Sequence, residues 1–183
     1  GAEYLREEER SQIAVIAVKK LTGPLDYEIS EFEIFKEADP AVSSPFPGRT
    51  MELLSLSLVP DPLSGMEQVK DLTDKTGNET IKISVPEGKH ALYGLVKITG
   101  FMQVINGAPG ATGPVLNHYD QAAIRKYLEH MSSEIEKRTG PLSQNIRALF
   151  TDSMELEGAN WSADIMDEFK KRRGYDIYPY LPF

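Results

Sequence analysis

The spacing of apolar residues changes at a Gly- and Pro-rich segment, residues 105–116 (INGAPGATGPVL). Before this segment the apolar residues form short runs or alternate with polar ones, which is typical of β-strands, and after it they recur at helical spacing. The change predicts a mixed α+β chain in two parts: a β-rich module over 12–104 and an α/β segment over 105–183. A length of 183 residues suits one large domain or two small ones.

Several short segments predict the strands of the first part. Residues 12–18 (QIAVIAV) and 51–59 (MELLSLSLV) are mostly apolar runs of strand length, and 79–85 (ETIKISV) alternates with a period of two. The turn residues 86–88 (PEG) then predict a hairpin between 79–85 and 91–98. Short strands separated by such turns favour a sandwich-like module.

The second part reads as helix, strand and helix. Asp120 can cap a helix that Gly140 ends, residues 146–150 predict a strand, and a second helix is expected from near Ser162 to Gly174. This order is that of a fragment of a (β/α)8 barrel. Because a complete barrel takes ~250 residues, the chain can hold only a part of one.

Composition narrows the classes of partner. The net charge of -8 and the pI near 5.0 argue against electrostatic binding of nucleic acid, and they are compatible with neutral partners such as sugars. No run reaches the ~18 apolar residues that cross a membrane. The absence of cysteine excludes disulfides and thiol catalysis. The chain opens with Gly1 and ends in the aromatic residues 178–183, which predicts a piece of a longer polypeptide.

Three carboxylates, Asp152, Glu155 and Glu157, closely follow the predicted strand. Loops after barrel strands are where active sites of such enzymes are built. Glycoside hydrolysis uses a carboxyl pair, one member protonating the leaving oxygen and the other activating water or attacking the sugar. The spacing alone leaves two further interpretations open, a solvated acidic loop and a calcium-binding scaffold loop.

Three other residues are candidates for contacts with a sugar. Asn160 offers a hydrogen-bonding amide, and Trp161, the single tryptophan of the chain, offers a stacking face. His118 precedes the first predicted helix and could lie at a barrel rim. The alternatives are that Trp161 packs against the start of the last helix and that His118 is a cap or surface residue.

The same residues resemble a known family. FTDSMELEGANW, followed by DEFKKRRGYDIYPYLP, resembles the barrel segment of bacterial α-L-rhamnosidases of glycoside hydrolase family 106. GAPGATGPVLNHYDQAAIRKYLEHM is similar to the stretch that enters the preceding barrel helix, and VPEGKHALYGLVKITG resembles a β-rich insertion before it. The resemblance implies a periplasmic or secreted carbohydrate-degrading enzyme with a (β/α)8 catalytic barrel and β-sandwich accessories. It implies no certain cofactor and leaves a calcium requirement of the full-length parent open.

The resemblance also assigns roles by position. Glu155 becomes a catalytic acid or base, Asp152 a catalytic partner that binds sugar or metal, and Asn160, Trp161 and His118 become substrate-binding residues. The second catalytic carboxylate would come from the remainder of the parent polypeptide, so the isolated chain is predicted to be inactive. The alternative function is a non-catalytic carbohydrate-binding or structural module.

Overall fold

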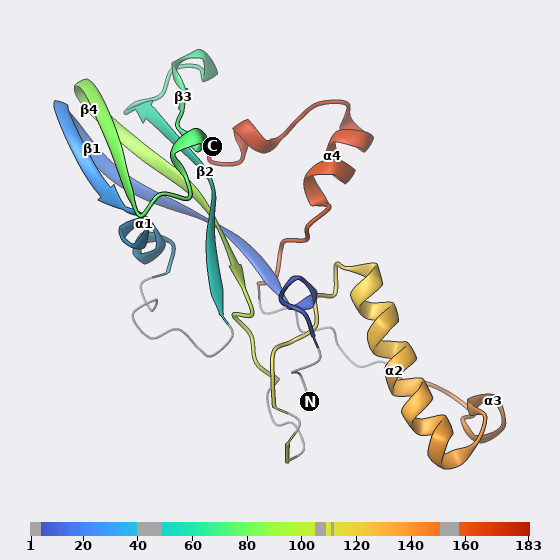
Figure 1. The fold of residues 1–183 in the computed structure, drawn as a ribbon. Coiled ribbons are helices and arrows are strands. Elements are labelled where there is room, and N and C mark those ends of the chain that lie inside the picture. Colours follow the sequence, from blue (N-terminus) through green and yellow to red (C-terminus); the bar gives the residue numbers. More distant parts are fainter. Residues whose placement is uncertain (1–4, 40–48, 105–108, 111, 151–157) are drawn as a thin grey trace.

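The computed structural model describes residues 5–39, 49–104, 109–110, 112–150 and 158–183. Figure 1 shows an antiparallel sheet with the C-terminal segment beside it and a helical arm that extends away from it. In chain order the elements are β1 (Gln12–Ser30), α1 (Glu31–Ala38), β2 (Thr50–Pro60), β3 (Lys70–Asp71), β4 (Thr80–Thr99), α2 (Gln121–Thr139), α3 (Leu142–Asn145) and α4 (Ile165–Arg173). Short 3-10 turns cover Glu7–Glu9, Met66–Gln68, Thr73–Lys75 and Tyr178–Tyr180.

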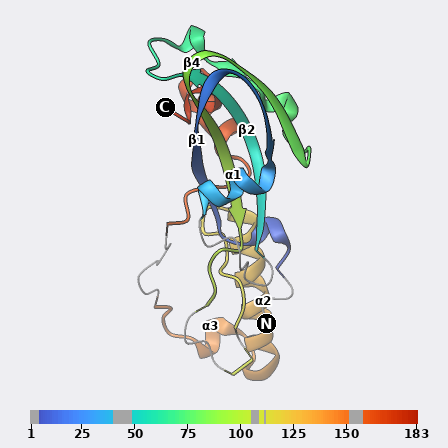
Figure 2. The same cartoon turned by 90° about the vertical axis from the view of Figure 1, so that its left-hand side faces the viewer.

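One four-stranded sheet, in the order β1-β4-β2-β3, holds the described strands together. β4 lies in the middle and pairs along its length with β1, from Gln12↔Thr99 to Ser30↔Thr80. Its other edge pairs with β2, and β2 pairs briefly with β3. Figure 2 shows that the long strands are strongly curved. The β-rich first part is therefore confirmed, whereas the second sheet of a sandwich is not found among the described residues.

The predicted hairpin turn at residues 86–88 is wrong, because this segment lies inside the continuous strand β4. The irregularity takes the form of a bulge: Gly23 pairs with Gly88, and the next pair is Leu25 with Val85. Proline has no amide hydrogen for a sheet, and bulges tolerate it. A Cβ atom on Gly23 would lie 1.9 Å from the Pro86 carbonyl oxygen, so glycine permits the close approach of the two backbones.

The main apolar core lies between the sheet and α1. Ser30 caps α1 by accepting a hydrogen bond from the Glu33 amide, and the helix buries Ile34 against the strands. A Cβ atom on Gly94 of β4 would lie 2.9 Å from Ile34 Cγ2, so the missing side chain lets α1 approach the sheet. The fully buried members of this core include Ile29, Leu56, Ile81, Leu92 and Val96.

The C-terminal segment covers the opposite face of the sheet. The Tyr93 ring of β4 meets the Phe183 ring edge to face, with centroids 5.2 Å apart. The Tyr178 hydroxyl donates a hydrogen bond of 2.6 Å to the Leu54 carbonyl oxygen of β2. Residues from the two predicted parts of the chain therefore share one packed unit at this face (Figure 1).

The helical arm begins and ends as the sequence predicts. The Asp120 carboxylate accepts hydrogen bonds from the Ala122 and Ala123 amides, and Gly140 ends α2 with a φ of 82°. α4 begins at Ile165, three residues after the predicted cap Ser162, and ends at Gly174 as predicted. None of the helices in the described ranges combines the length and apolar character needed to cross a bilayer.

The predicted strand at residues 146–150 does not form. This segment is irregular, and Leu149 and Phe150 expose 82% and 88% of their surface. A strand needs a neighbour for its amide and carbonyl groups. Within the described part of the chain no strand pairs with this segment, and no barrel-like arrangement is observed.

Candidate functional site

The two predicted catalytic residues, Asp152 and Glu155, lie outside the described residues, as does Glu157. Their roles stay predictions. The structure does describe the chain from Gly158 onward, and it places this segment against the first residues of β1. The candidate site comprises the residues that hold the chain immediately after the acidic stretch 151–157.

Asn160 fixes this segment to the outer edge of β1. Its side-chain oxygen accepts a hydrogen bond of 2.7 Å from the Ala14 amide, and its Nδ2 donates one of 3.2 Å to the Ala14 carbonyl oxygen. The backbone amides of Asn160 and Trp161 both donate to the Gln12 carbonyl oxygen. The Asn160 side-chain amide thus bonds to the backbone of β1 as a neighbouring strand would. Its predicted contact with a sugar stays a prediction.

Trp161 is 8% exposed and packs over the sheet. It lines an apolar groove of about 280 Å³ between the strands and α4, together with Leu95, Met166 and Phe169. This position corresponds to the packing alternative raised from the sequence. The substrate-binding role predicted for Trp161 is neither supported nor contradicted by this packing.

His118 is partly buried, and its neighbour Asn117 connects this stretch of the chain to Trp161. Asn117 is 1% exposed and donates a hydrogen bond of 3.5 Å from Nδ2 to the Trp161 carbonyl oxygen. The Asn117 side-chain oxygen accepts a bond from the Tyr119 amide. The fold therefore brings residue 118 into the same region as residues 160 and 161, which lie more than forty positions further along the chain.

A buried ion pair beneath this region was missed by the sequence reasoning. Glu9 is 2% exposed, and both of its carboxylate oxygens accept hydrogen bonds from Lys126 Nζ of α2, at 3.0 and 2.9 Å. Arg6 adds bonds from its amide and its guanidinium group, and Asn117 donates its amide to the Glu9 carbonyl oxygen. Glu9 stands in a run of three glutamates, so nothing in the local sequence marks it as buried.

The partners of Glu9 control its ionisation. Burial alone would raise the pKa of this carboxyl group, but the hydrogen bonds from Lys126 and Arg6 outweigh burial and hold the pKa below its usual value. Glu9 therefore remains an anion at neutral pH. It joins the N-terminal turn to α2, beside the backbone bond from the Asn117 amide to the Glu9 carbonyl oxygen.

A metal site is not found among the described side chains. Within those ranges no three His, Asp or Glu residues lie close enough together to hold an ion. The acidic stretch with Asp152 and Glu155 is outside the described ranges, so a calcium requirement stays a prediction.

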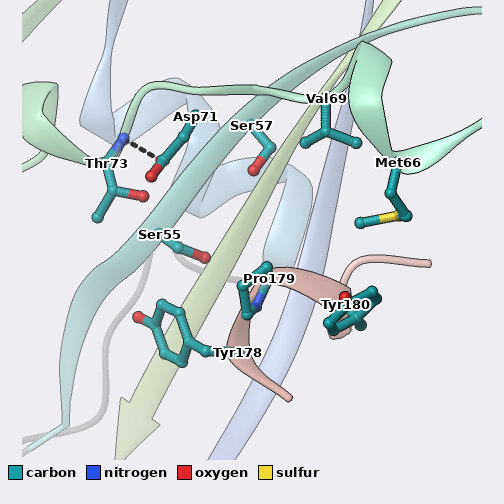
Figure 3. Close-up of a pocket in the computed structure, with 9 residues that line it drawn as sticks. All are labelled: Ser55, Ser57, Met66, Val69, Asp71, Thr73, Tyr178, Pro179 and Tyr180. Carbon is teal, nitrogen blue, oxygen red and sulfur yellow. Dashed lines mark hydrogen bonds between the residues drawn. The ribbon is translucent and has the colours of Figure 1, made fainter. Parts of the chain in front are cut away.

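A second hollow, here called the serine cavity, lies on the sheet face covered by the C-terminal residues (Figure 3). It has a volume of about 280 Å³ and is bounded by Tyr178–Tyr180 on one side. Ser55 and Ser57 of β2 are 6% and 8% exposed and contribute two hydroxyl groups to it. The remaining lining residues come from the connection between β2 and β4 and are Met66, Val69, Asp71 and Thr73.

The polar wall of the serine cavity is ordered by a short turn. Asp71 Oδ1 accepts a hydrogen bond of 2.8 Å from the Thr73 amide, drawn in Figure 3. The Thr73 hydroxyl and amide lower the pKa of the Asp71 carboxyl, so this group is an anionic acceptor at neutral pH. Burial raises the pKa of Tyr178, whose hydroxyl is already directed to Leu54. These residues carry no sequence motif, and the fold alone brings them together.

Comparison with known proteins identifies a family. Residues 58–183 match the family model Glyco_hydro_106, described as alpha-L-rhamnosidase. Among solved structures, the rhamnosidase from Novosphingobium sp. PP1Y is similar, with 31% identity and a TM-score of 0.50. The match covers 64% of this chain and 12% of that rhamnosidase chain. The search of curated proteins gives no match. These findings confirm the resemblance predicted from the sequence, including its partial extent.

Proposed function

Because the chain belongs to the α-L-rhamnosidase family, glycoside hydrolase family 106, we propose that it is a segment of an enzyme that cleaves α-L-rhamnosides. The observation that carries this proposal is the family match over residues 58–183, which includes Asp152 and Glu155. A periplasmic or secreted location of a bacterial parent, with a polysaccharide or glycoside as the partner, belongs to the same proposal.

In this proposal Glu155 serves as the catalytic acid or base and Asp152 binds the sugar or a metal ion. Glycosidic cleavage needs a second carboxyl group, and the remainder of the parent polypeptide supplies it. A catalytic carboxyl group must be held to within about 0.5 Å of its working position, which requires rigid support nearby. The anchoring of Asn160 and Trp161 to β1 offers such support only a few residues after Glu155.

The proposal includes a place in a barrel for the second part of the chain. The exposed segment with Leu149 and Phe150 would become a strand once barrel neighbours supply hydrogen-bond partners. The half-exposed side chains Tyr127 and Leu128 of α2 would pack against the same neighbours. Both features present apolar surface that the described residues leave uncovered, which supports this arrangement.

The test compares the 183-residue chain with the full-length parent on an aryl α-L-rhamnoside. The parent is expected to release the aryl group, whereas the isolated chain, with one carboxyl member of the pair, is expected to release none above background. Turnover by the isolated chain would contradict the division of the active site. A parent without turnover on any α-L-rhamnoside would contradict the substrate.

A further inference from the structure

The serine cavity has the size of a site for one small molecule. Its volume of about 280 Å³ falls just below the ~300–1,000 Å³ typical of pockets for drug-sized ligands. Figure 3 shows its side chains surrounding one space, with β2 and the β2–β4 connection facing Tyr178–Tyr180. The cavity therefore suits a single ring with short substituents rather than a chain of sugars.

One wall offers hydrogen bonds to a neutral polar ligand. The Asp71 carboxylate interacts with the Thr73 amide and hydroxyl and with the Leu72 amide. Because an ionised carboxylate has about four lone-pair sites, it keeps capacity to accept one more hydrogen bond, from a ligand hydroxyl group. The hydroxyl of Ser57 can both donate and accept, and Figure 3 shows it on the same side of the space. A carboxylate beside a hydroxyl matches the neighbouring hydroxyl groups of a sugar ring.

The other surfaces of the cavity are apolar or aromatic. Met66 and Val69 form one flank, and Pro179 and the half-exposed ring of Tyr180 form the floor. A pyranose has a face of C–H groups that can lie on such a ring. In a 6-deoxy sugar the methyl group adds an apolar corner, which Met66 and Val69 can accept without leaving a hydroxyl group unpaired.

We propose that the serine cavity binds one neutral 6-deoxyhexopyranose, with its hydroxyl groups on Asp71 and Ser57 and its methyl group against Met66 and Val69. The choice of a 6-deoxy sugar rests on the proposed function, since rhamnose is the sugar of the family. The site needs no catalytic carboxylate, so it can be tested in the isolated chain whether or not the parent hydrolyses rhamnosides.

The experiment is an amide NMR titration of the 183-residue chain with L-rhamnose and, separately, with L-mannose, which differs by a 6-hydroxyl group. A ligand of this size in an open pocket is expected to bind with a dissociation constant on the order of 1 mM. Shifts should saturate and should centre on Ser57, Asp71 and Tyr180. L-Mannose should bind about tenfold more weakly, because its extra hydroxyl group would face an apolar wall.

Two variants test the polar wall. Asp71→Asn keeps an oxygen for the Thr73 amide but removes the anionic acceptor, and it should weaken L-rhamnose binding about fivefold or more. Asp74→Asn, an exposed neighbour outside the cavity lining, is the matched control and should bind as the unmodified chain does. The spectra report folding of each variant directly.

Each result decides the matter. No saturable shift at about 20 mM L-rhamnose would overturn the site, as would unchanged binding by a folded Asp71→Asn variant. Equal affinity for the two sugars would overturn the assignment of a 6-deoxy ligand. Saturable binding together with a parent that hydrolyses no rhamnoside would leave the cavity standing and remove only the proposed enzymatic function.

Discussion

At the scale of single residues, the buried charge of Glu9 links the N-terminal turn to α2. Its side chain is buried, and the partners that compensate for burial come from opposite directions in the sequence, Arg6 and Lys126. Hydrogen bonds to charged groups contribute about 1.5–3 kcal/mol each, and a buried charge without its partners is costly. The ion pair thus adds a side-chain link between the N-terminal turn and α2, beside the backbone bond from the Asn117 amide to the Glu9 carbonyl oxygen.

Glu9→Gln is expected to lower the free energy of unfolding by about 2–3 kcal/mol, because the neutral amide loses the charge-assisted bonds. Urea unfolding followed by circular dichroism measures this. Glu8→Gln is the control: Glu8 also contacts Arg6, but its side chain is 53% exposed, and the change should stay within about 0.5 kcal/mol. Equal effects of the two substitutions would argue against a structural role for burial at position 9.

The stabilisation by Glu9 has a defined dependence on pH. An unfolded glutamate has a pKa of about 4.3, and the folded pKa of Glu9 lies lower. Its contribution is therefore complete above about pH 4.3 and is lost as the pH falls through the folded pKa. The stability gap between the unmodified chain and Glu9→Gln should be constant from about pH 6 to 7 and shrink below about pH 4. A gap that grows on acidification would contradict this assignment.

At the scale of elements, β1 and β4 are long strands of 19 and 20 residues that stay paired on both sides of a bulge at Gly23. Gly23→Ala is expected to destabilise the fold by about 3 kcal/mol or more, because the new Cβ atom would meet backbone rather than a movable side chain. Thr22→Ala, at the exposed neighbouring position, should change the free energy of unfolding by about 0.5 kcal/mol or less. Thermal unfolding of both variants measures the difference, and similar melting temperatures would refute the close backbone approach.

The elements also show where sequence patterns suffice. Helix α2 was predictable at both ends because Asp120 and Gly140 act through local hydrogen bonds and a local φ angle. The continuity of β4 could not be predicted, because residues 86–88 (PEG) have the local chemistry of a turn. Only pairing with β1 keeps this segment in a strand. The segment 146–150 fails as a strand for the opposite reason: it has strand composition without a partner strand in the described ranges.

At the scale of the whole molecule, family membership was readable from the sequence because it depends on motifs, and the family match extends upstream to residue 58. The placement of Asn160 and Trp161 was not readable, because their anchor is the edge of a strand more than 140 positions away. The serine cavity could not be predicted from the sequence for the same reason. Its walls come from β2, the β2–β4 connection and the C-terminal turn, and each segment is unremarkable alone.

The most direct test of the account is Glu155→Gln in the full-length parent, with turnover of an aryl α-L-rhamnoside and binding of L-rhamnose measured separately. Glu157→Gln, two positions along the same acidic stretch of the sequence, is the matched control. The account predicts a loss of turnover by about 100-fold or more for Glu155→Gln with binding retained, and little change for Glu157→Gln. Unchanged turnover in Glu155→Gln would contradict the central claim that this carboxyl group takes part in cleavage.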